Sequence, residues 1–92
     1  MSKIKIQKLT DTSNKTVKLL TKRLKKVLDV AFQYETTIYW IHWSENNEGW
    51  MIDIFEYCSE DTTIKELSDI EDYDYILCSG KAKQAVEWAL FG

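Results

Sequence analysis

Two aromatic segments in the middle of the chain constrain the fold more than any other feature. Residues 36–44 (TTIYWIHWS) and 50–57 (WMIDIFEY) are rich in β-branched and aromatic residues, and a polar loop ending in Gly49 separates them. This pattern predicts a β-hairpin. Both alternating sets of residues in the first segment are apolar, so we expect a central strand whose two faces are covered.

Two amphipathic helices are expected, one before this hairpin in the sequence and one after it. Apolar residues from Val17 to Tyr34 recur at spacings of three and four, which predicts a helix over residues 14–34. Residues 80–91 predict a closing helix with a small, alanine-rich inner stripe.

The remaining elements are shorter. Residues 3–9 alternate lysine or glutamine with apolar side chains, which indicates an edge strand with Ile4 and Ile6 facing inward. Residues 74–79 predict another strand, and Thr63 opens a pattern that resembles a capping box before a short helix.

The predicted order is therefore β-α-β-β-(short α)-β-α. We expect an α+β two-layer sandwich, with two main helices packed on a mostly antiparallel sheet, built as one domain over residues 1–92.

Composition narrows the possible chemistry. The chain has two cysteines and one histidine, too few for a disulfide framework or a structural zinc site, so we expect no metal and no cofactor. We interpret both cysteines as reduced and buried. The first residues lack the apolar run of a signal peptide, which favours a cytoplasmic location without a membrane partner.

An enzymatic function is not expected. Cys78 precedes a predicted helix, and His42 is the only histidine. One cysteine and one histidine without a diagnostic spacing are weak evidence for a thiol enzyme. The sequence Ser79-Gly80-Lys81 lacks the other residues of a phosphate-binding loop.

Charge is divided sharply between the two parts of the chain. Residues 1–34 hold nine Lys/Arg and two Asp, a net charge of +7; residues 35–92 hold thirteen Asp/Glu and three Lys, a net charge of −10, and together these give −3. The densest acidic run lies in residues 60–74. Its seven acidic residues are Glu60, Asp61, Glu66, Asp69, Glu71, Asp72 and Asp74.

This run allows two interpretations. It is either a solvated surface, or a surface that imitates a phosphate backbone and occupies the basic nucleic-acid site of another protein. Aromatic residues on one face of the hairpin would add an apolar contact. The expected set is Tyr39, Trp43, Phe55 and Tyr57.

The leading hypothesis is a non-enzymatic protein–protein interaction module that uses these acidic and aromatic residues. In size and acidity the chain resembles small phage-borne inhibitors of nucleic-acid enzymes, including anti-CRISPR proteins. The aromatic face could instead join two copies in a homodimer, or both faces could be covered by helices of the same chain.

The alternative hypothesis is nucleic-acid binding. If the first strand is set aside, the order α-β-β-β-α and the segment 79–90 (SGKAKQAVEWAL) are similar to the double-stranded-RNA-binding domain. That resemblance implies phosphate contacts from Lys81 and Lys83. The basic helix over residues 14–34 would add Lys22, Arg23, Lys25 and Lys26.

Overall fold

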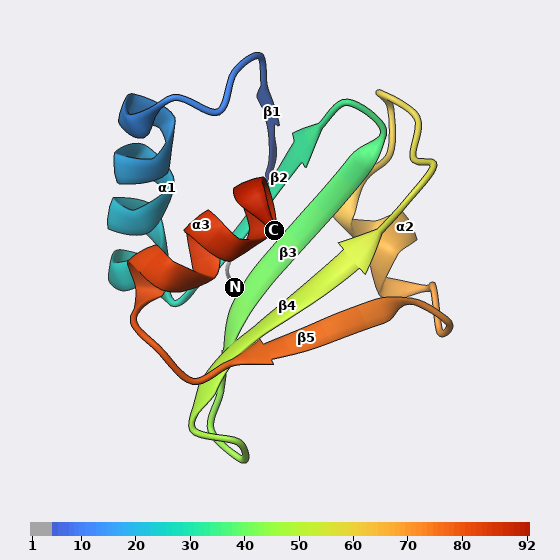
Figure 1. Ribbon diagram of the computed structural model, residues 1–92. Coiled ribbons are helices and arrows are strands. Elements are labelled where there is room, and N and C mark those ends of the chain that lie inside the picture. Colours follow the sequence, from blue (N-terminus) through green and yellow to red (C-terminus); the bar gives the residue numbers. More distant parts are fainter. Residues whose placement is uncertain (1–4) are drawn as a thin grey trace.

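The aromatic strand predicted from the sequence lies in the middle of the sheet. The computed structural model describes residues 5–92, and in it β3 (Thr37–Ser44) is the central strand of five (Figure 1). The spatial order is β1-β2-β3-β4-β5, the same as the order along the chain. The other strands are β1 (Ile6–Leu9), β2 (Asp29–Tyr34), β4 (Gly49–Phe55) and β5 (Asp74–Cys78). Only the β1–β2 pair is parallel.

The two longer helices cover one face of this sheet. α1 (Asn14–Val27) and α3 (Ala82–Phe91) pack against each other and against the strands, and Figure 1 shows α3 crossing in front of the sheet. Their buried side chains join Phe32, Ile41 and Ile52 in the larger of two core clusters. We call this side of the sheet the closed face. The expected α+β fold with two main helices on a mostly antiparallel sheet is confirmed.

A short helix lies against the opposite face. α2 (Ile64–Ser68) contributes Leu67 to a smaller cluster with Ile38 of β3 and Phe55 of β4. Thr63 caps this helix as predicted, since its hydroxyl accepts a hydrogen bond from the Glu66 backbone N–H at 3.3 Å. With only five residues, α2 covers a limited area, and we call this side the open face.

The predicted helix over residues 14–34 is wrong in its second part. α1 ends at Val27, because Leu28 adopts a left-handed conformation with φ 60° and its N–H bonds to the Leu24 carbonyl at 2.8 Å. The following residues form β2, between β1 and β3. Both faces of β2 are buried, so its apolar residues continued the helical spacing by coincidence.

The other elements agree with their predictions within a few residues. The inner stripe of α3 is buried as expected, and the backbone N–H of Lys81 donates to Gln84 Oε1 at 2.7 Å at the start of this helix. β1 is an edge strand, with Ile6 packed against the smaller cluster. The predicted start of this strand, with Ile4, lies outside the described residues.

The register of the hairpin separates the predicted aromatic set. Trp43 pairs with Trp50, so odd-numbered residues of β3 share a face with even-numbered residues of β4. Tyr39 and Trp43 therefore lie on the closed face, and Phe55 lies on the open face. Tyr57 follows β4 and is 89% exposed. These four aromatic residues do not form one surface, which corrects the prediction.

Candidate docking surface

The open face of the sheet is only partly covered. α2, the sheet and neighbouring loops surround a hollow of about 540 Å³, which we call the central hollow. Its floor includes Trp40, His42 and Asp53 from the two central strands. Its remaining lining residues are Val27, Leu28, Asp29, Trp43, Phe55, Leu67, Ser68, Ile70 and Tyr73.

Strand pairing explains why polar groups meet in this hollow. Asp29 of β2 lies opposite His42 of β3, while Asp53 of β4 lies opposite Trp40. The indole N–H of Trp40 donates to Asp29 Oδ1 at 2.6 Å, and His42 Nε2 lies 2.9 Å from Asp53 Oδ2. The side chains thus form two diagonal pairs across three strands.

Each pair changes the acidity of its members. The hydrogen bond with Asp53 raises the pKa of His42 above its ordinary value, although burial opposes this change. Burial raises the pKa of Asp29, although the hydrogen bond from Trp40 opposes it. Asp53 is 6% exposed, so His42 is the group that compensates its carboxylate. A cationic His42 is the form that this arrangement favours.

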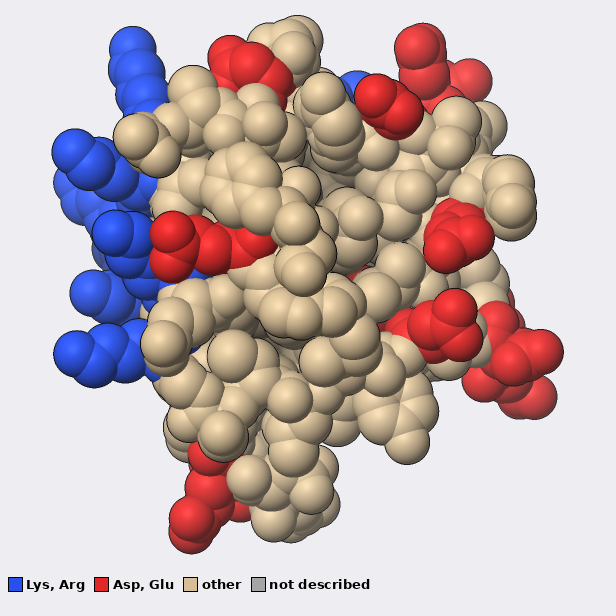
Figure 2. Space-filling model, in the orientation of Figure 1, with Lys and Arg blue, Asp and Glu red and all other residues tan. Residues whose placement is uncertain are grey.

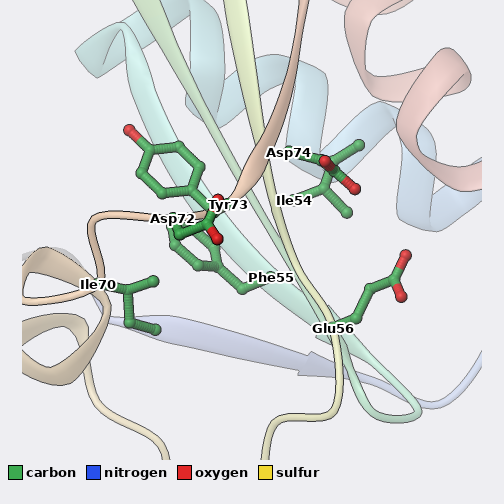
Figure 3. Close-up of a pocket in the computed structure, with 7 residues that line it drawn as sticks. All are labelled: Ile54, Phe55, Glu56, Ile70, Asp72, Tyr73 and Asp74. Atoms are coloured by element: carbon green, nitrogen blue, oxygen red, sulfur yellow. The ribbon is translucent and has the colours of Figure 1, made fainter.

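A second hollow of about 320 Å³ adjoins the first, and we call it the acidic hollow. The two share Phe55, Ile70 and Tyr73, and the rings of Phe55 and Tyr73 lie 4.8 Å apart. Figure 3 shows these three side chains on one side of the β4 strand end, with Glu56 and Asp74 on the other. Ile54 and Asp72 complete the lining. Ile54 packs against the larger cluster and pairs with Asp74, so these two residues belong to the closed face, and the acidic hollow extends around the end of β4 from one face of the sheet to the other.

Large apolar side chains around the two hollows remain exposed. Tyr75 and Leu77 of β5 belong to the open face, because they pair with Asp53 and Met51. They are 63% and 43% exposed. Val27, Leu28, Ile70 and Tyr73 are also exposed. An apolar area of this kind, rimmed by charge, is typical of an interaction surface.

The predicted acidic residues are all exposed, but the structure does not gather all of them. Asp72 and Asp74 line the acidic hollow. The others, Glu60, Asp61, Glu66, Asp69 and Glu71, lie outside both hollows. In Figure 2 the basic side chains gather on the left, over α1, while acidic side chains lie on the right, on the side of β5 and α2, and also at the top, at the bottom and beside the basic group.

The predicted nucleic-acid contacts are also divided. Lys22 and Lys25 of α1 line a groove with Lys83 of α3. Arg23 instead donates to Gln7 Oε1 of β1 at 2.6 Å. Lys26 and Lys81 do not line the groove. The resemblance to the double-stranded-RNA-binding domain also weakens, because four strands rather than three lie between α1 and α3.

The structure does not bring together the residues of a thiol enzyme. Cys78 pairs with Trp50 and packs on the closed face, while His42 lies on the open face. The sheet therefore separates the two side chains. Both cysteines are free and half-buried rather than fully buried as predicted, and burial raises the pKa of Cys58.

The chain matches no protein-family model, no curated protein and no solved structure. Within residues 5–92, no helix is long and apolar enough to cross a membrane.

Several residues of this surface were not predicted as functional. Asp29, Trp40, Asp53, Glu56 and Tyr73 come from four separate segments, and only the strand register brings them together. One signal was present in the sequence. Asp53 interrupts an otherwise apolar strand, and a carboxylate in such a position needs a partner.

Proposed function

We propose that this protein is a protein-binding module that holds a basic partner surface against the open face. The observation that supports the proposal is the pair of adjoining hollows, which bring the exposed Tyr73 side chain of the open face next to carboxylates at the sheet edge beside the end of β4. Aromatic anchors supply contact area, and carboxylates select cationic side chains.

Charge complementarity defines the partner. Glu56, Asp72 and Asp74 line the acidic hollow, and no Lys or Arg lines either hollow. An arginine from a partner could stack on Tyr73 while pairing with one of these carboxylates. Nucleic-acid-processing enzymes carry such basic surfaces. We therefore propose that the module works as an inhibitor that imitates nucleic acid, in the cytoplasm, with the exposed acids of residues 60–74 steering the approach.

The test measures binding of a defined basic probe. The ¹⁵N-labelled protein is titrated with an arginine-rich peptide, and backbone and indole N–H signals are followed by NMR. We expect the largest shifts at Asp72, Tyr73 and Asp74, which line the acidic hollow. The double variant D72K/D74K should weaken binding at least about tenfold, because it replaces two attractive charges in the acidic hollow by two repulsive ones.

A matched control separates this site from general attraction to a negative protein. The variant E45K/E48K changes the net charge equally but lies in the β3–β4 loop, outside both hollows. We expect it to weaken binding less than about threefold. Equal losses in the two variants would contradict the proposal.

The natural partner is then sought by affinity capture from a bacterial lysate, with and without nuclease. A protein that is retained after nuclease treatment by the wild type and by E45K/E48K, but not by D72K/D74K, would support the proposal. Retention by D72K/D74K would contradict it. Light scattering tests for a homodimer. A concentration-dependent dimer that is lost in Tyr73→Lys or Leu77→Lys would show that the partner is a second copy of the chain and not another protein.

A further inference from the structure

β5 forms one edge of the sheet, which Figure 1 shows at the lower margin of the strands. One side of this strand pairs with β4 along its whole length, from Asp74 to Cys78. In residues 5–92 no strand and no other backbone group pairs with its opposite side. A free side of this kind presents a row of unpaired N–H and C=O groups to solvent.

The pairing with β4 identifies the residues whose backbone groups point outwards. A Cβ atom at Gly49 of β4 would lie 2.9 Å from the carbonyl oxygen of Cys78, so this carbonyl points towards β4. Successive residues of a strand direct their N–H and C=O groups to opposite sides. The backbone groups of Ile76 therefore also point towards β4, and those of Tyr75 and Leu77 point outwards.

The outer side of β5 lacks the features that protect edge strands from pairing with other chains. Lysine side chains, proline and β-bulges are such features. β1, at the opposite edge, carries Lys8, and Arg23 of α1 donates to its Gln7 side chain. β5 contains no lysine, arginine or proline, and its register with β4 is continuous. β5 is therefore the edge that is suited to accept another strand.

The side chains of β5 define the kind of strand that would fit. Tyr75 and Leu77 are exposed on the open face, where they would contact apolar side chains of an added strand. Asp74 is exposed on the closed face, and a basic side chain opposite it would stabilise the pair, whereas an acidic one would repel it. Because neighbouring residues of a strand lie on opposite faces, apolar and basic residues should alternate in the added strand.

We propose that the basic partner supplies an extended segment of alternating apolar and basic residues, which pairs with β5 as an additional strand. The proposal rests on the proposed function and specifies how the partner is held. Backbone hydrogen bonds to Tyr75 and Leu77 provide affinity, and the side chains on each face provide specificity. The added strand adjoins the acidic hollow, because Asp74 belongs to β5 and also lines that hollow.

The first experiment measures amide hydrogen exchange of the ¹⁵N-labelled protein with and without a short peptide of alternating arginine and valine. The amides of Tyr75 and Leu77 gain a hydrogen bond on strand pairing, so their exchange should slow at least about tenfold. The amide of Ile76 already faces β4, so its exchange should change less than about twofold. Peptide binding without protection of Tyr75 and Leu77 would overturn the proposal.

A matched peptide separates strand pairing from attraction between charges. The same sequence, methylated at every backbone nitrogen, keeps its side chains and charge but loses all backbone donors. It should bind at least about tenfold more weakly than the unmethylated peptide. If both peptides bound equally and D72K/D74K weakened both, the proposed function would stand while strand pairing would be overturned. If neither peptide bound, both proposals would fail.

A pair of variants at one position tests the same point in the protein. Leu77→Pro removes the outward N–H, at an edge position where proline is tolerated, and should weaken binding of the unmethylated peptide at least about fivefold. Leu77→Ala keeps this N–H and should weaken binding less than about threefold. Equal losses, with the indole signals of the fold unchanged, would overturn the proposal, and the methylated peptide tests it independently of how Leu77→Pro folds. Protection of Tyr75 and Leu77 by self-association, without peptide, would also overturn it, because a second copy would then occupy the edge.

Discussion

The two faces of the sheet are built from the same strands, but helices cover them to different extents. The closed face is covered by two helices of fourteen and ten residues, and its central side chains, Phe32, Ile41 and Ile52, are fully buried. The open face is covered by a five-residue helix. It keeps His42 and Asp53 at its centre and leaves Tyr75 and Leu77 exposed.

This difference indicates a division of tasks. The closed face holds the larger cluster, so it provides most of the apolar burial that stabilises a small domain. The open face contains apolar and charged side chains that are partly exposed, and these contribute less to folding than the buried side chains of the closed face. Substitutions on the two faces should therefore have different effects on stability and on binding.

The largest expected effect separates the faces by stability. Ile52→Ala on the closed face should lower the free energy of unfolding by about 2–5 kcal/mol, because it leaves a cavity in the core. Leu77→Ala, at a 43% exposed position of the open face, should cost less than about 1 kcal/mol. Urea denaturation measures both. Equal losses would mean that the open face is as important for folding as the closed one.

The next effect concerns the ion pair at the centre of the open face. His42→Ala leaves the buried Asp53 carboxylate without its partner, and should cost about 1–3 kcal/mol in urea denaturation. Asp53→Asn keeps a hydrogen-bonding side chain in place and should cost less. The reverse order would show that Asp53 has another source of compensation.

The pH dependence of stability sharpens the same point. The pKa of His42 is raised in the folded state, so protonation of His42 stabilises the fold. This stabilisation is complete at pH values below the unfolded pKa of 6.5, and it is lost as the pH rises through the folded pKa. The melting temperature of the wild type should therefore fall between about pH 6 and pH 8. The raised pKa of Asp29 has an effect of the same sign: its contribution to stability is lost as the pH rises above the ordinary pKa of 3.8.

The variant His42→Gln should remove this part of the pH dependence. In the wild type, the indole N–H signal of Trp40 should follow the same titration, because its ring lies 6.3 Å from His42. A melting temperature that rises over this range would contradict the direction of the His42 shift.

The smallest expected effect is local. Thr63→Ala removes the hydroxyl that caps α2, and a cap of this kind contributes about 1 kcal/mol. Because a five-residue helix depends on its cap and packing, the amides of α2 should exchange with solvent faster, with little change for α1. Faster exchange in α1 as well would show that α2 and the closed face unfold together.

Local patterns in the sequence were sufficient for most elements. The hairpin, the closing helix and the cap at Thr63 follow from alternation, helical spacing and polar capping residues, and the structure contains them. The boundary between α1 and β2 could not be found in this way. Leu28 adopts its left-handed conformation without glycine, and the buried strand after it keeps the apolar spacing of a helix.

The surface depends on information that local patterns do not contain. A loop over residues 45–48 decides whether odd-numbered residues of β3 lie beside odd or even residues of β4, and a change of one residue exchanges the two faces. Alternation within a strand implies that Asp53 and Phe55 share a face, but it does not show that Asp53 lies beside His42. The acidic residues of the segment 60–74 could be recognised from composition, but their positions in space could not be predicted.

The strand order has a consequence for how the chain reaches its fold. Each strand pairs with the strand that follows it in the sequence, and only the short β2–β3 and β3–β4 connections are needed to assemble the centre of the sheet. Contacts between residues close in sequence form with little loss of chain entropy. We expect refolding on a timescale of the order of milliseconds, with the central three strands forming a nucleus onto which both long helices then condense.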